Sequence, residues 1–132
     1  MRKSQMQENS RKNKDIGDEG EELAAEHLIG RGFSIVARNV RYKTGEIDII
    51  ARRGRELHFI EVKTRRDPSF MPPLEAVTEA KRMRMRRTAE WYLQDPRNGF
   101  NKRPLPSCFY GVIGVDLCGK NPGIECILDA FI

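Results

Sequence analysis

Two apolar segments separated by a short turn constrain the fold of this 132-residue chain more than any other feature. Residues 46–52 and 56–64 are rich in isoleucine, leucine, valine and phenylalanine, a composition typical of β-strands. The turn between them, residues 53–55, contains Gly54 and is short enough for a hairpin. The two segments are therefore predicted to pair as neighbouring antiparallel strands.

The remaining sequence predicts helices and strands on both sides of this hairpin. Residues 15–29 have apolar residues at helical spacing and acidic residues in the first turns, where the helix dipole favours them. Further segments are predicted as a strand at 33–40, a helix at 74–93 and two late strands at 109–117 and 124–132, with loops at 67–73 and 95–106. This order predicts an α/β sandwich with a mixed sheet.

The length fits one domain, and the domain is predicted to span residues 15–132. Residues 1–14 lack periodicity and are predicted to form a flexible N-terminal tail. No secretory signal is expected because residues 1–18 are polar, and no apolar run approaches the ~20 residues that cross a bilayer. We therefore expect a cytoplasmic protein without a membrane partner.

Basic residues are concentrated in two tracts of a chain whose formal net charge is +5. Residues 38–66 contain nine basic and four acidic residues, and residues 81–103 contain eight and two. The two tracts could bind a polyanion, or they could be solvated surface. Charge alone does not separate these alternatives.

Charged residues also interrupt the two hairpin strands. Because side chains alternate across a strand, Glu61 and Lys63 share one face of the second strand. Asp48 and Glu61 lie equally far from a turn centred between Gly54 and Arg55, so antiparallel pairing would bring the two carboxylates together. The alternative is a cross-strand ion pair that contributes only ~0.2–1 kcal/mol.

Two carboxylates beside an ammonium group suit a divalent cation. Mg²⁺ prefers hard oxygen ligands and commonly uses one or two carboxylates, which Asp48 and Glu61 would supply. Such a cation polarises a phosphoryl group, and Lys63 could orient the nucleophile or offset developing negative charge. The pattern is therefore compatible with hydrolysis of a phosphodiester.

The same residues carry a resemblance to known families. Asp48, twelve intervening residues and Glu61-Val62-Lys63 resemble the D…E-x-K core of PD-(D/E)XK nucleases, particularly those of the Holliday-junction-resolvase type. The surrounding sequence more closely resembles the bacterial YraN family across residues 16–131. The matching features are Gly17-x-x-Gly20-Glu21-x-x-Ala24, Arg38-Asn39, Gly45-Glu46-Ile47-Asp48-Ile49-Ile50-Ala51, Phe59-Ile60-Glu61-Val62-Lys63-Thr64-Arg65 and Ala130-Phe131.

The resemblance implies a restriction-endonuclease-like three-layer sandwich with a central mixed five-stranded sheet flanked by helices. It also implies a metal-dependent endonuclease acting on DNA, in branched or repair intermediates, with Mg²⁺ or Mn²⁺ as cofactor and a homodimer by analogy. The implied catalytic set is Asp48, Glu61, Lys63 and Glu21, with Asp48 and Glu61 as metal ligands. Glu21 could instead be an ordinary acidic residue of the first helix.

Four basic residues are expected to bind the nucleic acid: Arg65, Arg66, Lys81 and Arg84. Lys81 lies at helical spacing between Val77 and Met85, so its ammonium could emerge beside the site or turn to solvent. No base-reading motif is present, so recognition of DNA shape is expected. The alternatives to an endonuclease are a non-catalytic nucleic-acid-binding module and a structural partner in a larger assembly.

Overall fold

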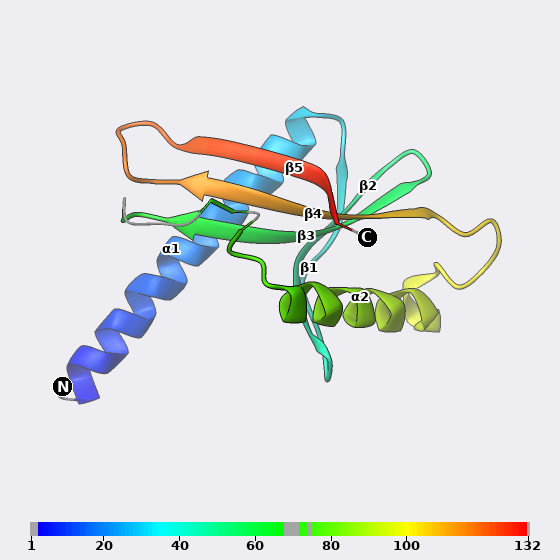
Figure 1. Ribbon diagram of the computed structural model, residues 1–132, viewed down its shortest axis with the longest axis horizontal. Coiled ribbons are helices and arrows are strands. Elements are labelled where there is room, and N and C mark those ends of the chain that lie inside the picture. The colour runs from blue at the N-terminus through cyan, green and yellow to red at the C-terminus, as the bar shows by residue number, and fades with distance from the viewer. Residues whose placement is uncertain (1–2, 68–71, 74, 132) are drawn as a thin grey trace.

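The computed structural model describes residues 3–67, 72–73 and 75–131, and for residues 3–16 it describes the backbone only. The described residues form two α-helices, one short 3₁₀ helix and five strands (Figure 1). Their bounds, in chain order, are α1 (Lys3–Gly30), β1 (Ser34–Tyr42), β2 (Gly45–Arg53), β3 (Glu56–Arg65), α2 (Glu79–Gln94), η1 (Pro96–Asn98), β4 (Ser107–Asp116) and β5 (Gly123–Phe131).

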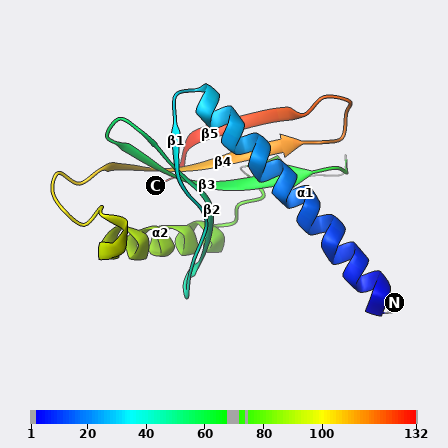
Figure 2. The same ribbon diagram turned by 180° about the vertical axis from the view of Figure 1, so that it is seen from behind.

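The five strands form one mixed sheet in the order β1-β2-β3-β4-β5. β3 and β4 are parallel, and every other neighbouring pair is antiparallel. A parallel pair requires a crossover connection, and the segment that contains α2 supplies it. α1 and α2 cover opposite faces of the sheet (Figures 1 and 2). The predicted three-layer α/β architecture with a mixed five-stranded sheet is confirmed.

Each face of the sheet has its own apolar core. On one face, α1 contributes Ala24, Ala25 and Leu28, which cluster with Ile49 and Ile60. On the other face, α2 contributes residues to a second cluster that includes Ala89, Tyr92, Ile47, Phe59 and Leu57. The neighbours Ile60 and Phe59 point into different cores, which is the alternation expected of a strand buried on both faces.

The β2–β3 hairpin has the predicted register. Arg53 pairs with Glu56 across the two-residue turn, and the ladder continues as far as Ile49 and Ile60. Gly54, at the first turn position, has a φ of 62°, a conformation that glycine adopts without steric cost.

The predicted starts of both helices were wrong. α1 begins at Lys3 rather than at Asp15, and it takes in most of the segment predicted as a flexible tail. This segment contains no glycine or proline, and good helix formers extend an existing helix at little cost. α2 begins at Glu79 because the side chain of Thr78 caps it by accepting a hydrogen bond from the Lys81 N–H (3.3 Å). Leu74, the predicted start, lies outside the described residues.

Within the described ranges, no helix is both long enough and apolar enough to span a bilayer.

Gly20 allows α1 to approach β3 closely. A Cβ atom at residue 20 would overlap the hydroxyl oxygen of Thr64 and lie 2.8 Å from its Cβ. We therefore expect Gly20→Ala to lower the free energy of unfolding by about 1–3 kcal/mol, as overpacking commonly does. Gly17→Ala is the matched control in the same helix, since nothing lies within 4 Å of a Cβ there. Gly17→Ala should stabilise the helix by about 0.5–1 kcal/mol. Urea unfolding of both variants measures the difference, and equal effects would contradict the close approach.

Candidate functional site

The candidate site lies where β2 separates from β3. Beyond the Ile49–Ile60 pair no further backbone pairing joins the two strands. At this point the Asp48 carboxylate accepts a hydrogen bond from the backbone N–H of Val62 (2.8 Å). The side chain of Asp48 thus takes the place of a backbone acceptor, and it lies beside Glu61.

Glu61 is the most deeply buried acidic group of the site, with 8% of its side chain exposed. Its Oε1 atom lies 3.4 Å from the Lys63 Nζ and 2.6 Å from the Lys81 Nζ. Lys63 comes from the same strand, whereas Lys81 reaches the site from α2. The sequence left two orientations possible for the Lys81 side chain. In the structure its ammonium group lies beside the site rather than in solvent.

The surroundings of Asp48 raise the pKa of its carboxyl group. Burial, followed by the negative charge of Glu61, raises the pKa of Asp48 to about 8. The hydrogen bond from Val62 opposes this shift, and the charge of Glu21 adds to it. Asp48 is therefore largely protonated at neutral pH.

The two lysines respond in opposite directions. Burial, followed by the contact with Lys81, lowers the pKa of Lys63. Burial also disfavours the charged form of Lys81, but its hydrogen bonds and the charges of Glu61 and Asp48 outweigh burial and raise its pKa. Lys81 therefore keeps its proton to a higher pH than Lys63 does.

Glu21 approaches the site from α1. With its amide group turned to satisfy both residues, Asn39 donates hydrogen bonds to the two Glu21 carboxylate oxygens (3.1 and 3.3 Å). Burial raises the pKa of Glu21. Its charge contributes to the raised pKa of Asp48, so Glu21 acts on the site electrostatically. Asn39 belongs to the Arg38-Asn39 feature of the YraN resemblance, but no role in the site was predicted for it. In the structure its φ of 52° within a strand marks an irregular position.

The predicted DNA-binding arginines differ in their surroundings. Arg65 forms an ion pair with Asp116 (2.7 Å), and Arg66 forms one with Glu19 (3.0 Å). Arg84 is exposed on α2. Arg65 also lines a cavity of about 250 Å³ together with Lys63, Asp116 and Glu125. This cavity gives a ligand access to the Lys63 side of the site.

The residues present fit a cation that needs few protein ligands. Among the residues that the structure describes, no cluster of three or more histidine, cysteine or acidic side chains could hold a metal ion. Asp48 and Glu61 supply two carboxylates, which is the usual protein share for Mg²⁺ when water and substrate complete the shell. A zinc site would need more protein ligands.

Comparisons with known proteins identify relatives along most of the chain. The UPF0102 protein of Symbiobacterium thermophilum is 46% identical over 101 residues, which cover 76% of this chain and 81% of the relative. That of Caldicellulosiruptor saccharolyticus is 46% identical over 114 residues, covering 85% and 91%. That of Dehalococcoides mccartyi is 40% identical over 117 residues, covering 89% and 93%.

A family model described as "Uncharacterised protein family UPF0102" matches residues 20–115. The match includes Glu21, Asp48, Glu61, Lys63 and Lys81. The resemblance to the YraN family is thereby confirmed, because this is the same family. The chain belongs to the UPF0102 family.

Proposed function

We propose that this protein is a metal-dependent endonuclease that hydrolyses DNA phosphodiester bonds in branched or repair intermediates. The observation that carries the proposal is the convergence of Asp48 and Glu61 with two lysines where β2 separates from β3. Burial, followed by the charge of Glu61, raises the pKa of Asp48 to about 8 there. Carboxylates with strongly raised pKa values are concentrated at functional sites. The proposal includes action in the cytoplasm, from the polar N-terminal residues, and as a two-fold dimer by analogy with resolvases.

Each side chain has a separate part in the proposed reaction. Asp48 and Glu61 would hold Mg²⁺, or Mn²⁺, which activates water and polarises the phosphoryl group when bound. Lys63 lies 3.4 Å from Glu61 and at the cavity, so it can offset negative charge that develops on the scissile phosphate. Lys81 neutralises Glu61 in the absence of the cation. Glu21 adds negative charge that favours cation binding.

A cleavage assay tests the proposal most directly. Linear, nicked and four-way DNA substrates would be incubated with the protein in Mg²⁺, in Mn²⁺ and in EDTA, with Asp48→Ala as control. The proposal expects cleavage that requires the cation and that disappears in Asp48→Ala. Absence of cleavage on every substrate would reject it.

A non-catalytic nucleic-acid-binding module is the second candidate. One observation favours it: the Asp48 carboxylate already has a structural role, since it accepts the Val62 hydrogen bond where the strands separate. This function predicts DNA binding that responds to salt but no turnover. A structural partner of a larger assembly, the third alternative, predicts neither.

The two arginines at the end of β3 give a test of the DNA path. If Arg65 and Arg66 contact phosphates, their joint replacement by alanine should make the log-log salt dependence of duplex affinity shallower by about 1.8, or about 0.9 per contact. Their ion pairs with Asp116 and Glu19 would have to rearrange on binding. A double variant of Arg55 and Lys102 removes two exposed charges elsewhere and is the control. An unchanged slope after replacement of Arg65 and Arg66 would place the DNA path elsewhere.

A further inference from the structure

A second cavity lies at the opposite end of α2 from Lys81. It has a volume of about 640 Å³ and is lined by Tyr42, Lys43, Trp91, Gln94, Asp95, Pro96 and Arg97. The tip of the β1–β2 hairpin, which crosses α2 in both views, supplies two of these residues (Figures 1 and 2). Trp91 is the only tryptophan of the chain, and 57% of it is exposed. A large aromatic side chain is therefore presented to solvent at a concave surface.

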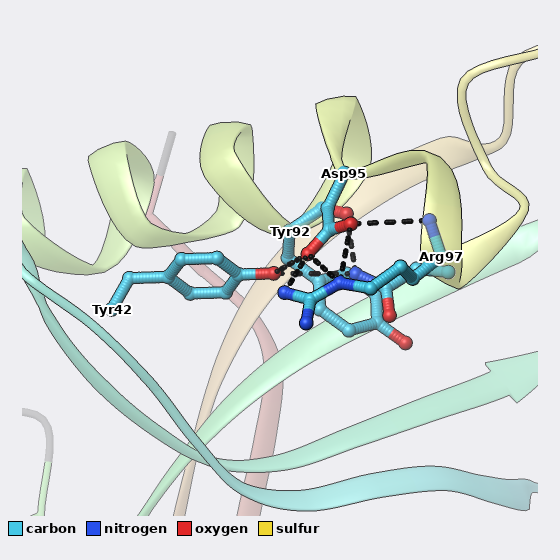
Figure 3. A network of polar contacts seen from close by, with 5 residues as sticks. Tyr42, Tyr92, Asp95 and Arg97 are labelled. Atoms are coloured by element: carbon cyan, nitrogen blue, oxygen red, sulfur yellow. Dashed lines mark hydrogen bonds and ion pairs between the residues drawn. The ribbon is translucent and has the colours of Figure 1, made fainter.

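The wall of this cavity is held by a network of hydrogen bonds (Figure 3). The Tyr42 hydroxyl donates to Asp95 (2.9 Å), and the Arg97 guanidinium donates to the same carboxylate (2.7 Å at its shortest). Asn98 donates to the Tyr42 hydroxyl and to the backbone carbonyl of Tyr92. The hydrogen bonds from Arg97, followed by that from Tyr42, hold the pKa of Asp95 well below its usual range.

Because the Asp95 charge is used inside the network, the cavity presents no unpaired carboxylate of its own. Since the Arg97 charge is likewise paired with Asp95, the groups that remain for a ligand are the aromatic face of Trp91, the amide of Gln94 and the cation of Lys43. An aromatic surface next to cations is the combination that binds an unpaired base and its phosphate.

A basic stripe joins this cavity to the candidate site. Arg84, Arg87 and Trp91 are exposed on α2 at spacings of three and four residues, so they lie on one side of the helix. Arg84 lies against the hairpin, since its Cβ is 3.7 Å from the position of a Cβ built on Gly45. Lys81, which contacts Glu61, is ten residues from Trp91, or about 15 Å along the helix axis.

We propose that the Trp91 cavity binds an unpaired base of a DNA strand by stacking, while Lys43 and the stripe of Arg84 and Arg87 contact the adjacent phosphates. This inference rests on the proposed action on DNA and specifies the substrate class: DNA with an unpaired segment. At ~3.4 Å per phosphate of a stacked strand, the 15 Å separation corresponds to about four nucleotides. The bound base therefore lies a few nucleotides from the phosphate at Glu61.

Tryptophan fluorescence tests this inference, because Trp91 is the sole source of the signal. The full-length protein would be titrated in EDTA with a single-stranded oligonucleotide, with a duplex carrying a single-stranded overhang and with a blunt duplex of equal length. The first two are expected to quench the fluorescence, and the blunt duplex is not. Equal quenching by all three DNA forms would overturn the inference. Failure of all three to quench the fluorescence would overturn it as well.

A matched pair of variants separates stacking from general attraction. Trp91→Ala is expected to weaken binding of the single-stranded oligonucleotide by about five- to thirtyfold, the lower part of the range for loss of base stacking. Its affinity for the blunt duplex should not change. Leu105→Ala removes an equally exposed apolar side chain far from α2 in sequence (61% exposed) and should change neither affinity. Equal losses in both variants, or on both DNA forms, would overturn the inference.

The cleavage assay distinguishes a failure of this inference from a failure of the proposed activity. Cleavage that depends on Asp48 but is unaffected by Trp91→Ala on DNA with an unpaired segment would reject the stacking site and leave the endonuclease standing. Quenching by single-stranded DNA without any cleavage would reject the endonuclease and leave the stacking site standing.

Discussion

Replacement of Glu61 by glutamine is expected to lower the rate of Mg²⁺-dependent cleavage by about three orders of magnitude or more. The substitution keeps the size of the side chain but removes one of the two carboxylates proposed to hold the cation. A cation contributes several kcal/mol of charge stabilisation in the transition state, and ~1.4 kcal/mol corresponds to a factor of ten. Single-turnover cleavage, with the protein in saturating excess over the DNA, would measure the loss.

Glu56→Gln is the control for this experiment. Glu56 is on the same strand, five residues before Glu61, and its partners are Arg53 and His58 rather than the lysines of the site. Its replacement should leave the rate within a few-fold of wild type. Because loss of Glu61 leaves Lys63 and Lys81 without their carboxylate, folding of the variant must be verified by its thermal transition. A folded Glu61→Gln protein with the wild-type rate would contradict the proposed metal ligand.

Local sequence rules predicted the register of the hairpin that carries the candidate site. The two-residue turn at Gly54 determines the register of β2 against β3, and register determines that Asp48 lies beside Glu61. Alternation along β3 likewise puts Glu61 and Lys63 on one face. These relations involve residues that are close in sequence, so few alternatives had to be excluded.

Contacts between distant elements were harder to predict. The 2.6 Å contact between Lys81 and Glu61 depends on how α2 packs on the sheet, and helical spacing alone left Lys81 free to turn to solvent. The hydrogen bond from Asn39 to Glu21 depends on an irregularity in β1. The Trp91 cavity combines residues 42–43 of the β1–β2 hairpin with residues 91–97 at the end of α2, and no local pattern of the sequence predicts that the hairpin crosses α2.

The free energy of unfolding of the metal-free protein should fall as pH rises from about 5 to 8 because of Asp48. Folded Asp48 keeps its proton up to about pH 8, whereas in the unfolded chain it loses the proton near pH 4. Between these values the unfolded state binds fewer protons, so the contribution of Asp48 decreases by up to about 1.4 kcal/mol per pH unit. Asp48→Asn should abolish this contribution and retain an oxygen acceptor for the Val62 N–H.

The difference between wild type and Asp48→Asn isolates this contribution from that of His58. Burial lowers the pKa of His58, so His58 destabilises the fold as pH falls below about 6.5, in both proteins alike. Urea unfolding in EDTA between pH 5 and 8.5 should show a stability advantage of Asp48→Asn that grows with pH. Addition of Mg²⁺ should stabilise wild type alone, by ~2.7 kcal/mol at a hundredfold excess over Kd.

Asp116→Asn is a control whose effect on stability is expected not to change with pH. The hydrogen bond from Arg65 lowers the pKa of Asp116 to about 2, so its stabilising contribution is complete above pH 4 and does not change between pH 5 and 8.5. Asp116→Asn should therefore lower stability by a constant amount across this range and leave the response to Mg²⁺ intact. If the free energy of unfolding of wild type and of Asp48→Asn depends on pH in the same way, the pKa of Asp48 is not raised in the folded protein. If Mg²⁺ stabilises both proteins equally, Asp48 is not a ligand of the cation. The carboxylate would then serve only to bridge β2 and β3 through Val62.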